Sequence, residues 1–176
     1  MAIDLEKTFT PINIAVLTVS DTRTPDTDTS GDILAKRLQD AGHTLAERLI
    51  VKDDASLLAA QFEQWIDDPQ IDAIISTGGT GLTGRDVTPE ALSRIEGGRD
   101  IPGFGELFRW LSYKSIGTST VQSRACAIVA RGTYIFALPG SNGAVKDGWD
   151  GILAEQLDSR NQPCNFVELM PRLTES

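Results

Sequence analysis

The chain has 176 residues, 40% of them hydrophobic, and its 16 basic and 25 acidic side chains give a formal charge of −9. This length supports one well-buried core rather than two, and the composition is that of an ordinary globular domain. The negative charge argues against nucleic-acid binding, which draws much of its affinity from Lys and Arg on phosphates.

The sequence contains few residues for metal or redox chemistry. His43 is the single histidine, and the two cysteines, Cys126 and Cys164, lie far apart without CxxC spacing. We therefore expect a reduced, cytoplasmic protein with Cys126 in its core. No apolar run approaches the roughly 20 residues of a membrane span. The stretch MAIDLEKTFTPI lacks the features of a secretion signal, so we expect no membrane partner.

Strand and helix patterns alternate along the chain. Short β-branched apolar runs such as INIAVLTVS are typical of strands buried on both faces. Longer segments with helical spacing follow them, opened by residues such as Asp28 or Ser56 and closed by Gly42 or Pro69. The predicted strands span residues 12–20, 43–53, 71–77 and 133–140, and the predicted helices span 32–42, 57–68, 88–95, 104–116 and 141–159, while 123–130 fits either.

This order predicts an α/β fold, in which a mostly parallel sheet has helices on both faces. We expect a single domain with its core at about 12–160 and an irregular tail at 163–176 that packs on a neighbour or frays. Ligands of such sheets bind outside the carboxyl ends of the strands. Four loops should therefore converge on one site, namely those at 20–31, 51–56, 77–89 and 138–144.

The most unusual of these loops is the glycine-rich stretch TGGTG at 77–81, which directly follows a predicted strand. Glycines let backbone amides approach a phosphate or a flat ring without a Cβ in the way. The stretch is not a Walker A loop, because no GK[ST] follows. A tight connection is the alternative, but the density of glycines beside Arg85 and Asp86 favours a ligand.

Two acidic residues, Asp53 and Asp86, are predicted to lie at the same edge of the sheet. Thr88 is the better-placed cap for the helix at 88–95, which leaves Asp86 free. Two carboxylates there would repel each other unless a cation lay between them, and Mg²⁺ commonly takes one or two carboxylates plus substrate phosphates. The alternatives are that Asp86 caps the helix and that Asp53 is a solvated turn residue.

An acidic protein that binds an anionic ligand must create positive potential locally. Arg85 and Arg124 are candidates for this role, because a guanidinium pairs with two phosphate oxygens at once. The segments at 29–31 and 140–141 precede or open predicted helices, where free N–H groups attract anions. Surface charge and plain helix capping are the alternatives for each feature taken alone.

Seven motifs in this order resemble those of molybdenum cofactor biosynthesis proteins of the MogA/MoaB type, across about residues 12–160. The motifs are TVSD (18–21), DTSG (28–31), STGGTG (76–81), RDVTPEA (85–91), PGFGELFR (102–109), SR (123–124) and LPGS (138–141). The resemblance implies a three-layer αβα domain that assembles as a trimer or hexamer. One departure is that Asn142 and Gly143 follow Ser141, where the family usually has proline or another defining residue.

The resemblance also implies an activity, the Mg²⁺-dependent transfer of AMP from ATP to the terminal phosphate of molybdopterin. It assigns catalysis and metal binding to Asp53 and Asp86. Nucleotide binding falls on Gly78, Gly79, Thr80 and Gly81. Binding of molybdopterin or phosphate falls on Ser20, Asp21, Thr29, Ser30, Gly31, Ser123, Arg124, Pro139, Gly140 and Ser141. The rival hypotheses are a non-catalytic molybdopterin carrier, which passes its ligand to other proteins of the pathway, and a structural subunit.

Overall fold

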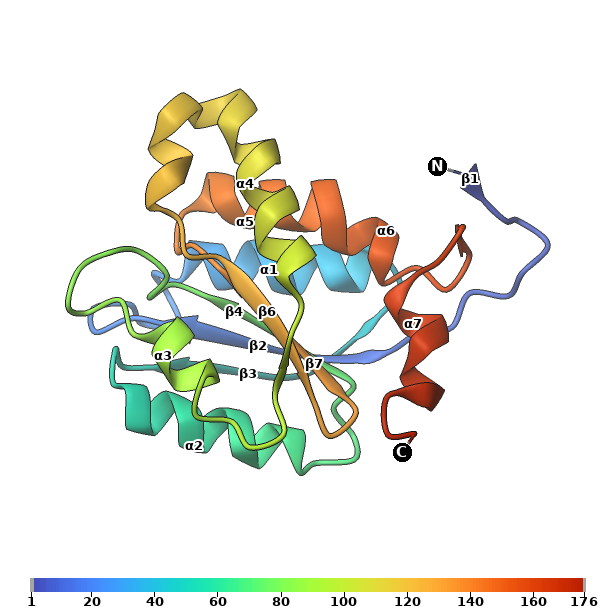
Figure 1. The fold of residues 1–176 in the computed structure, drawn as a ribbon, viewed down its shortest axis with the longest axis horizontal. Coiled ribbons are helices and arrows are strands. Elements are labelled where there is room, and N and C mark those ends of the chain that lie inside the picture. Colours follow the sequence, from blue (N-terminus) through green and yellow to red (C-terminus); the bar gives the residue numbers. More distant parts are fainter. Residues whose placement is uncertain (1, 176) are drawn as a thin grey trace.

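The fold is organised around a six-stranded sheet in which the strands lie in the order β3-β2-β4-β7-β6-β5 (Figure 1). A computed structural model describes residues 2–175. The four strands β3, β2, β4 and β7 are parallel, whereas β6 and β5 run antiparallel to their neighbours. The strands span Asn13–Val19 (β2), Thr44–Val51 (β3), Ala73–Thr77 (β4), Arg99–Asp100 (β5), Cys126–Ala130 (β6) and Thr133–Leu138 (β7). The mostly parallel sheet predicted from the sequence is confirmed.

Helices cover both faces of the sheet and complete three layers (Figure 1). One face carries α1 (Thr29–Asp40), α4 (Pro102–Ile116) and α5 (Asn142–Gly148), the last of which continues through a π-helical turn (Trp149–Leu153) into α6 (Ala154–Gln156). The other face carries α2 (Ala55–Ile66) and α3 (Thr88–Leu92). Within residues 2–175, no helix combines the length and apolar character needed to cross a membrane.

The alternation of side chains along the central strands explains this layering. Val16 of β2 belongs to the cluster with Phe108 and Trp149, whereas its neighbour Leu17 belongs to the cluster with Phe62. Successive side chains of a strand point to opposite faces, so an uninterrupted apolar run needs a helical cover on both sides. This requirement fixes the three-layer architecture and leaves only the strand ends for a ligand.

Two local predictions need correction, and one open choice is resolved. Within 123–130, which fitted either a helix or a strand, Cys126–Ala130 forms the antiparallel strand β6, preceded by a 3-10 helix at Gly117–Gln122. Helix α2 is capped by Asp54 rather than Ser56, because the Asp54 carboxylate accepts the N–H groups of Ser56 and Leu57 at 2.8 and 3.0 Å. Cys126 is only partly buried, and burial raises the pKa of its thiol to about 11.

The tail, expected to be irregular, packs on its own domain. The strand β8 (Asn161–Gln162), which pairs with β1 (Ala2–Ile3), precedes the tail. The tail itself forms α7 (Phe166–Leu169) and a 3-10 turn (Met170–Arg172). The ring of Phe166 lies 4.8 Å from that of Tyr134 and 5.4 Å from that of Phe136, measured between centroids. Asn165 caps α7 by accepting the N–H of Glu168 at 2.9 Å. The tail therefore extends the apolar core instead of fraying.

This packing predicts that Phe166→Ala lowers the free energy of unfolding by about 2 kcal/mol, because a partly buried ring is lost from the core. Urea denaturation followed by circular dichroism measures the change. Leu5→Ala is the control, because Leu5 is 85% exposed and its removal should change the stability little. Equal stability of the Phe166 variant and the wild type would show that the tail is not part of the folded core.

Candidate functional site

The four predicted loops meet at the carboxyl ends of β3, β2, β4 and β7, as expected. The N–H of Ser20 after β2 donates to the carbonyl of Val51 at 2.9 Å. After β4, the N–H of Gly78 donates to the carbonyl of Leu138 at 2.9 Å, and the Thr77 hydroxyl donates to the Pro139 carbonyl at 3.1 Å. These bonds hold the ends of the four parallel strands together as one rim.

The glycines of the 77–81 loop allow these strand ends to approach one another. Gly78 and Gly79 have φ angles of 107° and 66°, which favour glycine. A Cβ on Gly78 would lie 2.3 Å from the carbonyl oxygen of Val19, and one on Gly79 would lie 2.4 Å from the Thr88 hydroxyl. The N–H of Gly78 already bonds within the protein. Close packing of the rim therefore accounts for both glycines without a ligand.

The loop that carries Asp86 is fixed by internal hydrogen bonds. Thr88, predicted to cap α3, instead donates its hydroxyl to the Gly78 carbonyl at 2.9 Å, and α3 has no side-chain cap. Asp86, predicted to be free, accepts the N–H of Thr83 at 2.9 Å and its hydroxyl at 2.6 Å. The prediction for Thr88 was wrong because a tertiary contact occupies its hydroxyl, whereas Asp86 does not cap α3, as expected. The outcome is a rigid turn that places the Asp86 carboxylate.

The two acids differ in protonation energetics. Burial and the negative charge of Asp86 together raise the pKa of Asp53. Burial acts in the same direction on Asp86, but the hydrogen bonds from Thr83 and the charge of Arg124 outweigh it and lower the pKa of Asp86. Asp86 is thus a stabilised carboxylate, while Asp53 carries a charge that its surroundings disfavour. A cation between them would relieve the repulsion.

Asp53 and Asp86 are the residues that would hold a magnesium ion arriving with a phosphate ligand. Asp53 lies beside the first loop, since its N–H donates to the Asp21 carboxylate at 3.3 Å. Among the residues described, no group of three or more His, Cys, Asp or Glu is arranged to hold a metal by itself. Mg²⁺ commonly binds one or two carboxylates and completes its shell with water and phosphate oxygens, so two acids suffice.

Arg124, predicted to bind phosphate, braces the Asp86 loop instead. Its Nε donates to the Gly81 carbonyl at 2.7 Å, and its Nη2 donates to the carbonyl of Asp86 itself. Nη1 pairs with the carboxylate of Glu90 on α3. The guanidinium therefore bridges both ends of the 81–86 segment, with its donors directed at the protein. We assign Arg124 as a positioning residue for Asp86.

A second cation, Arg85, joins the loops after β2 and β4. Its guanidinium forms an ion pair with Asp21, although the Arg85 side chain is 70% exposed. An exposed ion pair of this kind contributes little to stability, so a phosphate can compete for the guanidinium. Arg85 remains a candidate ligand contact in a way that Arg124 does not.

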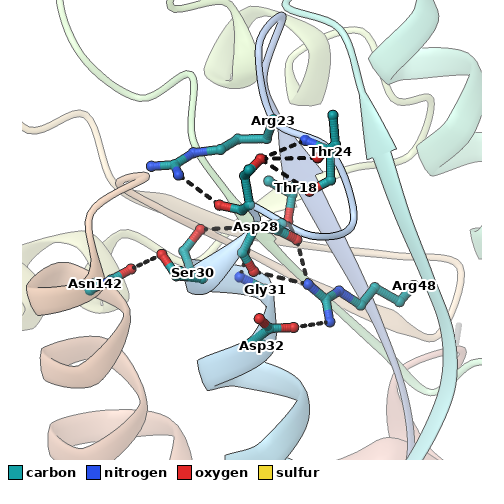
Figure 2. A network of polar contacts seen from close by, with 11 residues as sticks. Thr18, Arg23, Thr24, Asp28, Ser30, Gly31, Asp32, Arg48 and Asn142 are labelled. Carbon is teal, nitrogen blue, oxygen red and sulfur yellow. Dashed lines mark hydrogen bonds and ion pairs between the residues drawn. The ribbon is translucent and has the colours of Figure 1, made fainter.

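Asp28 is the centre of a buried network that engages the predicted anion site at 29–31 (Figure 2). Its fully buried carboxylate accepts from the Thr18 hydroxyl at 2.8 Å, from Arg48 at 2.7 Å and from the Gly31 N–H at 3.0 Å. Burial alone would raise the pKa of Asp28, but these hydrogen bonds lower it. The Ser30 hydroxyl also donates to Asp28, at 3.3 Å. The donors of Ser30 and Gly31 are therefore already used inside the protein.

The last loop is tied to this region. Ser141 caps α5 by accepting the Ala144 N–H at 3.1 Å. The hydroxyl of Thr29 donates to the side-chain oxygen of Asn142 at 3.0 Å. Asn142, which departs from the pattern the motifs resemble, thus links the loops after β2 and β7. Gly140 supports the same junction, because a Cβ there would lie 3.2 Å from the Cα of Gly78.

Several pockets lie along the strand-end loops: one of about 290 Å³ contains Asp86, and two others contain most of the predicted ligand-binding residues. The glycine-loop pocket, of about 340 Å³, contains the predicted residues Thr80, Gly81, Ser123, Pro139 and Ser141. The edge-strand pocket, of about 560 Å³, contains the predicted residues Ser20 and Asp21. The hydroxyl of Thr80, a residue that lines the glycine-loop pocket, is buried and has no hydrogen-bond partner among the described residues. The structure thus brings together residues that the sequence assigned to different ligands.

Several residues of the site were missed from the sequence. The glycine-loop pocket is also lined by Phe108, Ser112 and Thr120, which come from α4 and the 3-10 helix. These residues lie in a segment that reads as an ordinary amphipathic helix, so nothing in the sequence marks them. Arg48 pairs with Asp28 across 20 residues, and its position in a predicted strand gives no signal of that contact.

The fold and the rim together define an open α/β domain whose ligand edge is built from four strand-end loops. The family described as "Probable molybdopterin binding domain" matches residues 15–159. The chain is 49% identical over 158 residues to molybdenum cofactor biosynthesis protein B of Escherichia coli K12, which covers 90% of this chain and 92% of that protein. The chain therefore belongs to this molybdopterin-binding family, and the resemblance seen in the sequence is confirmed.

Further comparisons agree with this assignment. The protein of the same name from Bacillus subtilis strain 168 is 43% identical over 147 residues, or 83% of this chain and 86% of that protein. A crystal structure of a molybdenum cofactor biosynthesis protein B matches with a TM-score of 0.85 at 34% identity, covering 97% of this chain and all of the other. The relatives are thus similar over almost the whole domain, strand-end loops included.

The role of Arg124 predicts that Arg124→Gln increases hydrogen exchange of the amides at 81–86 by about tenfold or more, because the brace on both carbonyls is lost. Exchange measured by mass spectrometry tests this. The control is Arg94→Gln, since Arg94 makes a single exposed hydrogen bond to Ser56. Unchanged exchange in the Arg124 variant would show that the guanidinium does not hold the loop.

The raised pKa of Asp53 predicts that Asp53→Asn stabilises the ligand-free protein at pH 7. Asp53 ionises less readily in the folded chain than its usual value of 3.8, so its charge costs stability above the raised pKa and nothing below 3.8. Because Asp53 is partly solvated, the gain in Tm should be on the order of 1 °C. Scanning calorimetry of the variant and the wild type, at pH values from about 3.5 to about 7, tests this. A gain that persists at the acid end would contradict the electrostatic cause.

Proposed function

We propose that this protein transfers AMP from ATP to the terminal phosphate of molybdopterin in a Mg²⁺-dependent reaction that releases pyrophosphate. The family sets its role in molybdenum cofactor biosynthesis. The observation that supports the finer step is the acid pair at the convergent rim, where burial and the charge of Asp86 raise the pKa of Asp53. Such a charge arrangement suits a metal-bound polyphosphate better than an uncharged ligand.

The transfer needs no activated side chain. An oxygen of the molybdopterin phosphate attacks the α-phosphorus of ATP and forms a new P–O bond. The bond between the α-phosphorus and its bridging oxygen breaks, and pyrophosphate leaves with the electron pair. A phosphate is already ionised near neutral pH, so the absence of a histidine from the rim is no obstacle. Catalysis then rests on positioning and charge neutralisation, as in other phosphoryl transfers.

In this proposal Asp53 and Asp86 hold the metal, and the loop brace keeps them in place. Bound Mg²⁺ would neutralise the phosphate oxygens and the charge that develops on the leaving pyrophosphate. Thr83 and Arg124 fix the carboxylate of Asp86 before any ligand arrives. Pre-organised groups of this kind lower the reorganisation needed in the transition state.

The glycine-loop pocket is the place we propose for molybdopterin. Its volume of about 340 Å³ and its mix of apolar and hydroxyl groups suit a flat heterocycle with hydrogen-bonding edges. Phe108 and Ile116 provide apolar contact, while the unpartnered Thr80 hydroxyl offers a hydrogen bond. Pro139 and Ser141, which follow β7 at the rim, also line this pocket.

Homo-oligomers, trimers or hexamers, form part of the proposal. Helix α4 exposes several large apolar side chains, and it rises with the following 3-10 turn beyond its layer (Figure 1). The exposed residues are Leu107, Trp110, Tyr113, Ile116 and, in the turn, Val121. An exposed apolar face of this kind supports contact between subunits.

The function predicts that Asp86→Asn reduces turnover by roughly a hundredfold or more while molybdopterin binding is retained, because the amide oxygen still accepts from Thr83 but carries no charge. Pyrophosphate release from ATP, Mg²⁺ and molybdopterin measures turnover. Asp67→Asn is the matched control, because Asp67 directly follows the C-terminal end of α2 and its side chain is 71% exposed.

Each outcome discriminates between hypotheses. Normal turnover by the Asp86 variant would exclude a metal role for this carboxylate. A wild-type protein that binds molybdopterin but releases no pyrophosphate would be the non-catalytic carrier. A protein that binds neither ligand would be the structural subunit.

A further inference from the structure

Arg109 lies in α4 and is not among the residues that line the pockets at the strand ends. Its guanidinium is directed instead at the main chain between the 3-10 helix and β6. Nη1 donates to the carbonyl of Ala125 at 3.0 Å and to that of Ser123 at 3.4 Å. These two carbonyls flank Arg124, the residue that braces the Asp86 loop. One side chain of α4 therefore holds the main chain on both sides of Arg124.

From this arrangement we infer that Arg109 is a positioning residue for the Asp86 carboxylate and that it acts through Arg124. The consequence for catalysis rests on the proposed function, whereas the contacts themselves do not. The side chain of Arg124 donates to the carbonyls of Gly81 and Asp86, and its N–H donates to the carbonyl of Thr80 at 2.8 Å. These donors reach their acceptors only while the main chain of Arg124 stays in place. A group that fixes residues 123–125 thus also fixes the loop at 81–86.

Residues 123–125 need such support because they belong to neither the 3-10 helix nor β6. Regular hydrogen bonding of a helix therefore does not hold this connection. Ala125 is only 2% exposed, and a buried carbonyl without a donor is costly. A guanidinium is suited to this position because it carries several donors on a rigid plane.

Helix α4 provides a fixed base for Arg109. Phe104 and Phe108 anchor the helix in the hydrophobic core. Gly105 brings its backbone close to the connection, since a Cβ there would lie 2.4 Å from the Ala125 carbonyl oxygen. The hydroxyl of Thr120 donates to the carbonyl of Arg109 itself at 3.1 Å. The segment that returns from α4 to β6 is therefore tied to Arg109 through both its main chain and its side chain, and a rigid support of this kind can hold a functional group precisely.

A purely structural role for Arg109 gives different expectations. A guanidinium that only stabilised the fold would, when removed, loosen the whole domain, and its effect would add to that of removing Arg124. Two guanidiniums that act in series would show a local effect, and the second substitution would then change little. Residues that share one network deviate from additivity in this way.

The test measures hydrogen exchange of the full chain by mass spectrometry. Arg109→Met removes the donors but keeps an unbranched apolar stem. It should increase exchange of the amides at 81–86 by about threefold or more, but by less than about 1.5-fold when Arg124→Gln is already present. Arg99→Met is the matched control, because the Arg99 guanidinium donates to a single carbonyl, that of Leu173, at 3.1 Å.

Three outcomes of this measurement would overturn the inference. They are unchanged exchange at 81–86, an equal increase with and without Arg124, and an increase shared by the amides of α2 and β2. The experiment contains no ligand, so its result does not depend on the proposed function.

A second measurement addresses catalysis. Arg109→Met should raise the Mg²⁺ concentration for half-maximal pyrophosphate release by about fivefold, because Asp86 is held less precisely. Arg109→Lys, which keeps a charged donor on the helix, should restore this concentration to within about twofold of wild type. An unchanged Mg²⁺ requirement in the Met variant would overturn the inference. If the wild type releases no pyrophosphate, the proposed function fails, and the exchange measurement still decides whether Arg109 positions the Asp86 loop.

Discussion

The repulsion between Asp53 and Asp86 is the interaction around which the site is built. Burial and like charge raise the pKa of Asp53, yet the rim keeps the two acids near each other. The glycines at 78 and 79 let β2 and β4 approach without a steric clash, and Thr88 and Arg124 fix the intervening loop. Much of what looks like a ligand motif therefore holds the acids in place.

Positive charge is distributed unevenly over the strand ends of this strongly acidic chain. Positive side chains gather at the end of β3, whereas the pocket beside the glycine loop carries none. Asp28 contributes to this separation, because it neutralises Arg48 and leaves Lys52 and Arg23 as the available cations of the pocket. Charge is thus divided between the two pockets rather than spread over the rim.

The sequence predicted the fold well because buried strands and amphipathic helices can be recognised from the spacing of their hydrophobic residues. It also predicted the convergence of the loops, since parallel strands end at one edge. The hydrogen-bond partners of the polar side chains could not be predicted from the sequence. Arg124 and Ser30 stand in motifs that suit anions, but each donates to a protein oxygen that the fold brings near. Such contacts depend on residues far away in the sequence.

The central claim is that Asp53 and Asp86 share a cation with a bound nucleotide. A crystal structure with Mg²⁺ and an ATP analogue that resists cleavage at the α-phosphorus tests it directly. The account predicts a metal at about 2.1 Å from an oxygen of each carboxylate and from phosphate oxygens of the nucleotide. An ordered nucleotide with its metal bound away from both carboxylates would contradict the account.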